Sequence, residues 1–170
     1  KCFEKGLELY PDELNILDAL AATYLAARKL DKAEEVLEKL IDLNKNDAAF
    51  HKNYGELHYL NGEVEKAEEA FKQAIAIKPK NLDSYLRLGQ IYYSKGEREQ
   101  ALRYLKTGVN MFPDNKEIVK LIGIISFETG NYAEAIKYYK NFLAHNQYDP
   151  DILSNLGFIY KELGFINFAI

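Results

Sequence analysis

Two histidines, His51 and His58, have the spacing in this sequence that comes closest to a chemical site. They are seven positions apart in a stretch of helical periodicity, so they share one face and could act as a pair of metal ligands. However, no Cys or carboxylate stands at ligand spacing beside them on that face, and a metal centre needs three or four ligating groups. The sequence therefore favours a structural role for both histidines.

The carboxylates gather in three short clusters, which are Glu34–Glu35, Glu65 with Glu68–Glu69, and Glu97 with Glu99. Each cluster falls early in a predicted helix, where the helix dipole favours negative charge. Lysines three or four residues away make these clusters typical of a solvated face. The sequence contains no HExxH, GxSxG, GxGxxG or GxxxxGK[ST] motif. We therefore expect no catalytic centre, no cofactor and no metal.

Composition excludes several classes of protein. A length of 170 residues suits one ordinary domain or a run of small repeats, and 48% hydrophobic residues argue against wholesale disorder. A net charge of −4 argues against a nucleic-acid-binding surface. The lone Cys2 cannot form an internal disulfide and leaves cytosol and periplasm both open. No apolar run approaches the ~20 residues that cross a bilayer, so we expect no direct membrane insertion of this segment.

An internal repeat supplies the elements that must position any functional residue. Four glycines in similar sequence contexts are spaced by 34 residues, at Gly55, Gly89, Gly123 and Gly157, with Ala21 one step earlier. Other columns keep this step, namely glycines from Gly62 to Gly164 with Arg28 in first place, alanines from Ala33 to Ala169, and Pro11, Pro79 and Pro113. Agreement of several columns at one period indicates a repeat architecture.

Each repeat reads as two helices. Residues 48–61 and 64–77 both carry apolar side chains at helical spacing, and Gly62 between them suits a left-handed C-cap. Pro79 ends the second helix. The predicted N-caps of first helices are Asp47, Asn81, Asn115 and Asp149. The short loops require consecutive helices to pack antiparallel.

The 34-residue period and the paired helices resemble the tetratricopeptide repeat (TPR) family over essentially the whole chain. The resemblance implies an all-α fold, a right-handed α-solenoid of antiparallel helix pairs (TPR superhelix). It places first helices at 14–27, 48–61, 82–95, 116–129 and 150–163, and second helices at 30–43, 64–77, 98–111 and 132–145. In this family pattern, His51 and His58 occupy core positions.

The repeat frame predicts a single TPR array over residues 1–170. The predicted parts are the second helix of a truncated repeat at 1–13, full repeats at 14–47, 48–81, 82–115 and 116–149, and a truncated repeat at 150–170. We therefore expect a fragment of a longer array. The C-terminal stretch is apolar where a terminal repeat is normally polar, so Phe165, Phe168 and Ile170 are expected to be exposed or covered by a neighbouring molecule.

In TPR proteins one strip of each first helix faces a concave groove, and the resemblance implies that this groove binds a partner. The candidate groove residues are Lys52, Asn53, Glu56, Tyr59, Leu86, Arg87, Gln90, Tyr93, Lys120, Ile124, Phe127 and Phe158. Aromatic anchors with a few charges suit an extended segment or a helix of another protein. The alternative is that Tyr59, Tyr93 and Phe127 pack against the next first helix, and both interpretations can hold because a tyrosine can bury its ring and present its hydroxyl.

The predicted function is therefore a non-catalytic protein-protein interaction scaffold that binds a peptide or helical segment. Two alternatives are self-assembly into homo-oligomers through the array ends or groove, and service as the targeting or regulatory arm of a larger enzyme. One TPR subtype binds the acidic tail of heat-shock chaperones, and we reject that role. Asn53 and Arg87 match its pattern, but Asp18, Ala22 and Asp83 stand where Lys, Asn and Lys are needed.

Overall fold

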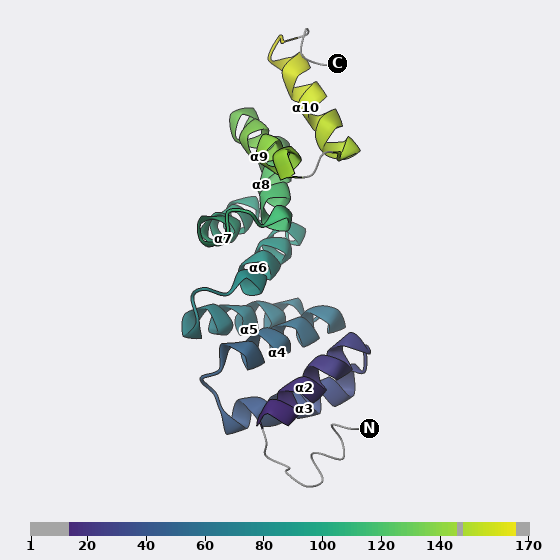
Figure 1. Cartoon of the computed structure of the whole chain (residues 1–170), viewed down its shortest axis with the longest axis vertical. Coiled ribbons are helices and arrows are strands. Elements are labelled where there is room, and N and C mark those ends of the chain that lie inside the picture. Colours follow the sequence, from purple (N-terminus) through teal and green to yellow (C-terminus); the bar gives the residue numbers. More distant parts are fainter. Residues whose placement is uncertain (1–13, 146–147, 166–170) are drawn as a thin grey trace. The chain divides into compact units, whose positions relative to one another are not determined.

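The computed structural model describes residues 14–145 and 148–165 of the chain (Figure 1). Within these ranges every regular element is an α-helix and there is no strand, so the all-α expectation is confirmed. The predicted second helix at 1–13 and the side chains of Phe168 and Ile170 lie outside the described residues. Phe165 lies within them and is 52% exposed, as expected for the apolar C-terminal stretch.

The helices recur at the interval of the sequence repeat. The first helices are α2 (Leu14–Ala26), α4 (Ala48–Asn61), α6 (Leu82–Ser94), α8 (Lys116–Glu128) and α10 (Pro150–Glu162). The second helices are α3 (Leu30–Leu43), α5 (Val64–Ile77), α7 (Arg98–Met111) and α9 (Tyr132–His145). Within each series, successive helices begin 34 residues apart (48 − 14 = 34 for α2 and α4), and every bound lies within one residue of the predicted one.

Left-handed residues reverse the chain inside each hairpin. Gly62, which follows α4, has φ 77°, and the later glycines of its column have φ between 73° and 79°. Arg28 holds the same column position after α2 and has φ 54°. A side chain in this conformation costs roughly 1 kcal/mol or more, because its Cβ crowds the following carbonyl oxygen. The first hairpin therefore carries a strain that the glycine-turned hairpins avoid.

Side-chain caps begin the first helices, as predicted. The Asp47 carboxylate accepts from the Ala49 amide at 2.8 Å, and the Asn81 side chain accepts from the Ser84 amide at 3.3 Å. The Asn115 and Asp149 side chains accept from amides three residues on, at 2.9 and 3.1 Å. Each cap satisfies an amide that the first turn of a helix leaves without a partner.

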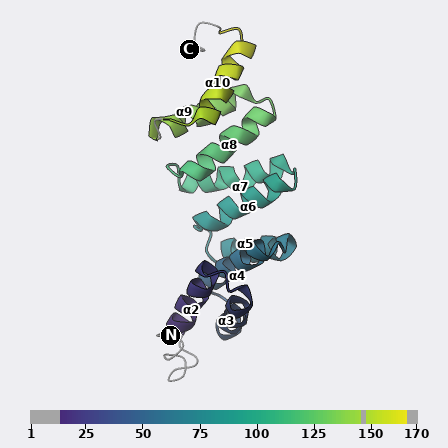
Figure 2. The same ribbon diagram turned by 90° about the vertical axis from the view of Figure 1, so that its right-hand side faces the viewer.

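The chain divides at the Ile91–Tyr92 bond into two compact units. In the first unit, α2 packs along α3 and α4 packs along α5 (Figures 1 and 2), and α4 also contacts α2 and α3. A buried cluster joins these helices through Leu17, Leu20, Leu37, Leu40, Phe50 and Leu57. This core holds α4 in place, and α4 carries several of the predicted groove residues.

The second unit is built around α8, α9 and α10. α8 packs along α9 and also contacts α7, while α10 packs against α9. Its buried cluster combines Ala135 and Tyr139 of α9 with Ile152, Leu156 and Ile159 of α10. The apolar stripe 152–156–159 therefore fixes which face of α10 turns inward.

The repeated glycine of the first helices permits close helix contact. A Cβ built on Gly55 would lie 2.9 Å from the Phe71 ring, and one on Gly123 would lie 2.7 Å from the Tyr139 ring. Both rings are fully buried. The ring of the second helix thus lies directly against the backbone of the first helix at these two glycines. Gly157 differs, because its Cβ would meet no heavy atom within 4 Å.

Candidate functional site

A hollow in the first unit collects five of the predicted groove residues. Its lining comprises Lys52, Asn53 and Glu56 from α4, Asp83, Leu86 and Arg87 from α6, and Phe71 from α5. Its volume is about 350 Å³. Residues three and four apart on each helix line the hollow because they share a helix face. The site is therefore formed by one face of α4 and one face of α6, together with Phe71 of α5.

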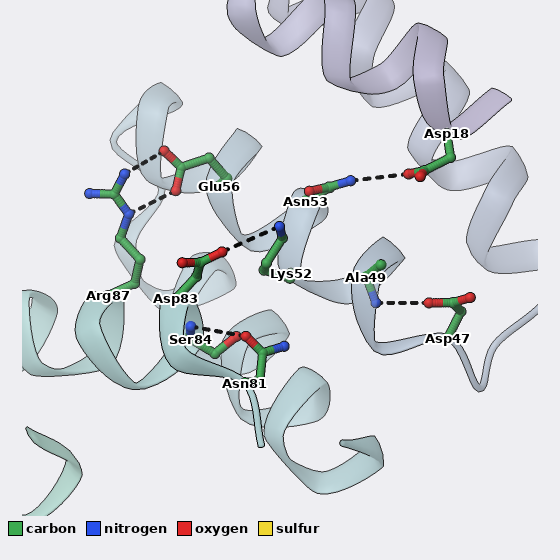
Figure 3. Close-up of polar contacts among 10 residues, drawn as sticks. All are labelled: Asp18, Asp47, Ala49, Lys52, Asn53, Glu56, Asn81, Asp83, Ser84 and Arg87. Atoms are coloured by element: carbon green, nitrogen blue, oxygen red, sulfur yellow. Dashed lines mark hydrogen bonds and ion pairs between the residues drawn. The ribbon is translucent and has the colours of Figure 1, made fainter. Parts of the chain in front are cut away.

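Arg87 is the most constrained side chain of the hollow. Its Nε and Nη2 donate to the two carboxylate oxygens of Glu56 at 2.8 and 2.7 Å, which is a bidentate pair (Figure 3). Its Nη1 donates to Gln90 Oε1 at 3.0 Å, and the guanidinium carbon lies 4.8 Å from the centre of the Tyr59 ring. This network joins α4 to α6 and presents Arg87 in one orientation.

Two further polar contacts link successive first helices, one between lining residues of the hollow and one from the hollow to α2. Lys52 Nζ lies 3.4 Å from Asp83 Oδ2, and Asn53 Nδ2 donates to Asp18 Oδ1 at 3.2 Å (Figure 3). The Lys52–Asp83 pair is long and Asp83 is largely exposed, so water screens it strongly. The charges of the hollow are thus balanced within the chain, and a partner's charged group has to compete with existing contacts.

The predicted groove residues make up most of this site, and three contributors are not among them. Tyr59 and Gln90 do not line the hollow and instead hold Arg87. Phe71 is not among the predicted groove residues, yet it contributes to the lining. Asp18 and Asp83 were omitted from the binding residues, and both pair with groove side chains.

Tyr93, Lys120, Ile124, Phe127 and Phe158 belong to the second unit and are described there. The Tyr93 hydroxyl donates to Glu128 Oε1 at 2.5 Å, and Arg98 pairs with the other oxygen of Glu128 at 3.1 Å. The hydrogen bond to Glu128 raises the pKa of Tyr93, and burial adds to this effect. Tyr93 therefore links α6 to α8, which is consistent with the alternative that this residue contacts the next first helix.

Three rings form an aromatic patch in the second unit, consisting of Phe127 of α8, Tyr132 of α9 and Phe158 of α10. Phe127 and Phe158 meet edge to face with centroids 5.7 Å apart, and Tyr132 lies 6.2 and 6.4 Å from the two phenylalanines. Phe127, Tyr132 and the neighbouring Ile124 pack against the buried cluster of the unit, whereas Phe158 is 47% exposed. The aromatic patch thus exposes one apolar ring, that of Phe158, to solvent.

Lys120 lies beside this surface on α8. Its ammonium pairs with Asp149 Oδ2 at 2.7 Å and lies 5.7 Å from the centre of the Phe142 ring. The hydrogen bond from Lys120 lowers the pKa of Asp149. The hydrogen bond that the Ile152 backbone amide donates to Asp149 in the helix cap also lowers this pKa. Lys120 therefore supports the start of α10 as well as contributing a charge.

The two histidines of α4 are held apart by separate partners. His58 is fully buried, its Nδ1 is hydrogen-bonded to the Glu63 carboxylate, and its ring meets Tyr54 edge to face at 4.3 Å. The half-buried His51 contacts the Lys45 carbonyl oxygen through Nε2 at 2.9 Å. Over residues 14–145 and 148–165, no three His, Cys, Asp or Glu side chains gather in a way that could hold a metal ion. Both histidines thus serve the packing and turn of their own hairpin.

None of the helices in the described part of the chain has both the length and the apolar character that a bilayer crossing requires.

Two family models match the chain. The tetratricopeptide-repeat domain of cytochrome c-type biogenesis protein H matches residues 44–152, which is more than half of the chain. A general tetratricopeptide-repeat model matches residues 14–57. No curated protein sequence matches the chain significantly.

Several solved structures share the fold. MamA is 27% identical with a TM-score of 0.77, and the match covers 85% of each chain. YrrB, described as a TPR protein with an unusual peptide-binding site, is 19% identical with a TM-score of 0.84, covering 100% of this chain and 88% of its own. PilW, a type IV pilus biogenesis factor, is 22% identical with a TM-score of 0.79, covering 98% of this chain and 78% of its own.

Proposed function

The chain belongs to the tetratricopeptide-repeat family, and from that membership we propose that it is a non-catalytic scaffold binding a peptide or helical segment of another protein. Its fold class is the all-α solenoid of antiparallel helix pairs that the sequence resemblance implied. Two candidate binding surfaces are considered separately, the hollow of the first unit and the aromatic patch of the second unit.

The exposed ring of Phe158 carries this proposal. Phe158 is 47% exposed although it contacts two other rings, so about half of the burial available to its side chain is gained only when a partner covers it. Clustered aromatic side chains supply much of the binding energy at protein interfaces. We therefore assign the main anchoring contact to the aromatic patch, with an apolar side chain of the partner placed against Phe158.

The hollow of the first unit has a different role in this proposal. Its charges already satisfy one another through the Glu56–Arg87 and Lys52–Asp83 pairs, so a partner gains little by adding one charge there. Leu86 and Phe71 offer apolar lining between the ion pairs. A segment with a small apolar side chain and backbone polar groups suits this lining, and the peptide-binding site of the similarly folded YrrB supports a peptide as ligand.

A matched pair of variants tests the proposal. Phe158→Ser removes the exposed ring of the aromatic patch, and Tyr148→Ser removes a more exposed ring, at 76%, from the loop before α10. Partners captured by the immobilised chain from its host lysate are quantified by mass spectrometry, and melting is measured in parallel. We expect at least one partner to be lost with Phe158→Ser and retained with Tyr148→Ser, at little change in melting temperature.

Equal capture by both variants would show that Phe158 anchors nothing. A loss of capture that follows a loss of stability would instead favour packing between repeats as the role of the aromatic patch. The triple change of Tyr59, Tyr93 and Phe127 to Ala extends the test, because those residues already contact the following first helix or its neighbours.

A further inference from the structure

The exposed sides of the second helices carry two different residue patterns. At the same three positions of each repeat, the sequence reads Glu-Glu-Val at 34–36 and Glu-Glu-Ala at 68–70, but Leu-Arg-Tyr at 102–104 and Ile-Lys-Tyr at 136–138. The middle residue of each triplet is exposed to solvent. The first unit therefore presents glutamates at the position where the second unit presents cations.

These residues define an acidic face on the first unit and a basic face on the second. The acidic face comprises Glu35 of α3 and Glu69 of α5, and the basic face comprises Arg103 and Tyr104 of α7 with Lys137 and Tyr138 of α9. The Arg103 guanidinium carbon lies 5.1 Å from the centre of the Tyr104 ring, and Lys137 Nζ lies 5.5 Å from the centre of the Tyr138 ring. The rings hold both cations in place without neutralising their charge.

The charges of the two faces are not used inside the described part of the chain. Lys106 of α7 pairs with Glu134 of α9 at 2.7 Å, so the neighbouring charges of these helices are balanced. By contrast, the four charged side chains of the two faces form no ion pair over residues 14–145 and 148–165. Glu69 accepts a hydrogen bond from the neutral Gln73 amide at 2.9 Å. These four charges are therefore open to a group from outside the chain.

The acidic and basic faces match in spacing. Glu35 and Glu69 are one repeat apart (69 − 35 = 34), and so are Arg103 and Lys137 (137 − 103 = 34). Both pairs stand at the same position of successive second helices, so we expect the two charges of each pair to be similarly far apart. Opposite charges repeated at one spacing complement each other at two points at once, which favours one way of docking over others.

Side-chain size follows the same division. The small, buried Val36 and Ala70 come directly after the two glutamates, whereas the half-buried rings of Tyr104 and Tyr138 come directly after the two cations. Large side chains of the basic face can therefore meet small ones of the acidic face. Such complementarity of shape is typical of specific protein interfaces.

We propose that two copies of this chain associate through their second helices, with the acidic face of one copy against the basic face of the other. A second copy is the occupant that the sequence specifies, because it carries the opposite charges at the same repeat spacing. Exposed ion pairs each contribute little, so the association is reversible and is weakened by salt. This inference goes beyond the proposed function, since its contact surface includes neither the hollow nor the aromatic patch.

Charge reversal followed by mixing tests the proposal. Sedimentation velocity of the 170-residue chain is measured at rising protein concentration, and we expect association in low salt that weakens about tenfold or more in high salt. Arg103→Glu with Lys137→Glu makes both faces acidic, and Glu35→Lys with Glu69→Lys makes both faces basic. Each double variant alone should stay monomeric. An equimolar mixture of the two should associate again, because every face then meets the opposite charge.

The control is Lys116→Glu with Lys161→Glu, which changes the net charge equally at exposed positions of two first helices. It should associate like the unaltered chain, and circular dichroism should show similar melting for all variants. A chain that stays monomeric in low salt would overturn the proposal, as would a mixture that fails to associate. Association that persists in high salt and in both double variants would assign the contact to apolar groups such as the exposed Phe165, and would also overturn it.

An acidic protein is the other occupant that the basic face could take. Poly-glutamate is the probe for this outcome. Its binding to a monomeric chain, with loss of binding in Arg103→Glu with Lys137→Glu, would refute a second copy as the occupant. Phe158→Ser should leave self-association unchanged, so this proposal and the proposed function fail in separate experiments.

Discussion

Alanine at two equivalent glycines should change stability in opposite directions. Gly123 and Gly157 lie 34 residues apart at the same position of α8 and α10, but only Gly123 faces a ring. The added methyl at Gly123 would lie 2.7 Å from the buried Tyr139 ring, so the helices must separate or the ring must move. Overpacking of this kind costs roughly 1–3 kcal/mol, while replacing glycine in a helix returns roughly 0.5–1 kcal/mol.

The expected net effects follow from these two terms. Gly123→Ala should lower the free energy of unfolding by about 1 kcal/mol, and Gly157→Ala should raise it by about 0.5–1 kcal/mol. Urea unfolding followed by circular dichroism measures both. Leucine naturally occupies the position of Tyr139 one repeat earlier, at Leu105, so Tyr139→Leu is a compatible background in which the Gly123→Ala penalty should shrink. Equal stabilisation by both alanines would refute the packing argument.

Three further predictions concern single contacts. Arg28→Gly should raise the free energy of unfolding by about 1 kcal/mol, because it relieves a left-handed arginine at the position of Gly62; a lower urea midpoint would contradict this. Folding lowers the pKa of Asp149 from its ordinary 3.8, so its stabilisation is complete above that value and is lost as pH falls through the folded pKa. Asp149→Asn keeps a capping oxygen, and its stability should therefore fall less on acidification than that of the wild type, as urea midpoints across pH would show. In a double-mutant cycle, Glu56→Gln and Arg87→Met should couple by about 1 kcal/mol at low salt and by less at high salt, and additivity at low salt would mean that the bidentate pair contributes nothing.

The fold was predictable because the repeat places the same kind of residue at the same point in every hairpin. The glycine that follows α4, the caps at Asp47 and Asp149, and the glycine under the Phe71 ring are local requirements of backbone or volume. Each of these requirements restricts which residue types can occupy the position, so the position can be recognised in the sequence. Helix bounds within one residue of the prediction followed from them.

The polar contacts of the candidate site were only partly predictable. Lys52 with Asp83 and Glu56 with Arg87 are both opposite charges 31 residues apart, so a search at one repeat minus three would have found them. The same rule would pair Lys120 with Asp151, yet Lys120 pairs with Asp149. Which of several nearby partners a long side chain contacts depends on its rotamer and on the angle at which the helices cross. Neither of these can be read from the pattern of residues.

The exposure of the Phe158 ring could not be predicted from the sequence. Phe127 and Phe158 both appeared as groove aromatics, but only the packing of α8, α9 and α10 decides which ring is covered. Its half-exposed state depends on contacts far apart in the chain, and it is the feature on which the proposed function rests.

Photo-crosslinking from α10 tests the proposed function most directly. A benzophenone-bearing amino acid at Phe158 would lie in the aromatic patch, and the same group at Lys137, an exposed residue of the second helix α9, is the control. With a partner identified by the capture experiment, we predict crosslinks to one segment of that partner from position 158 and none from position 137. Crosslinks from position 137 alone would contradict binding along the first helices.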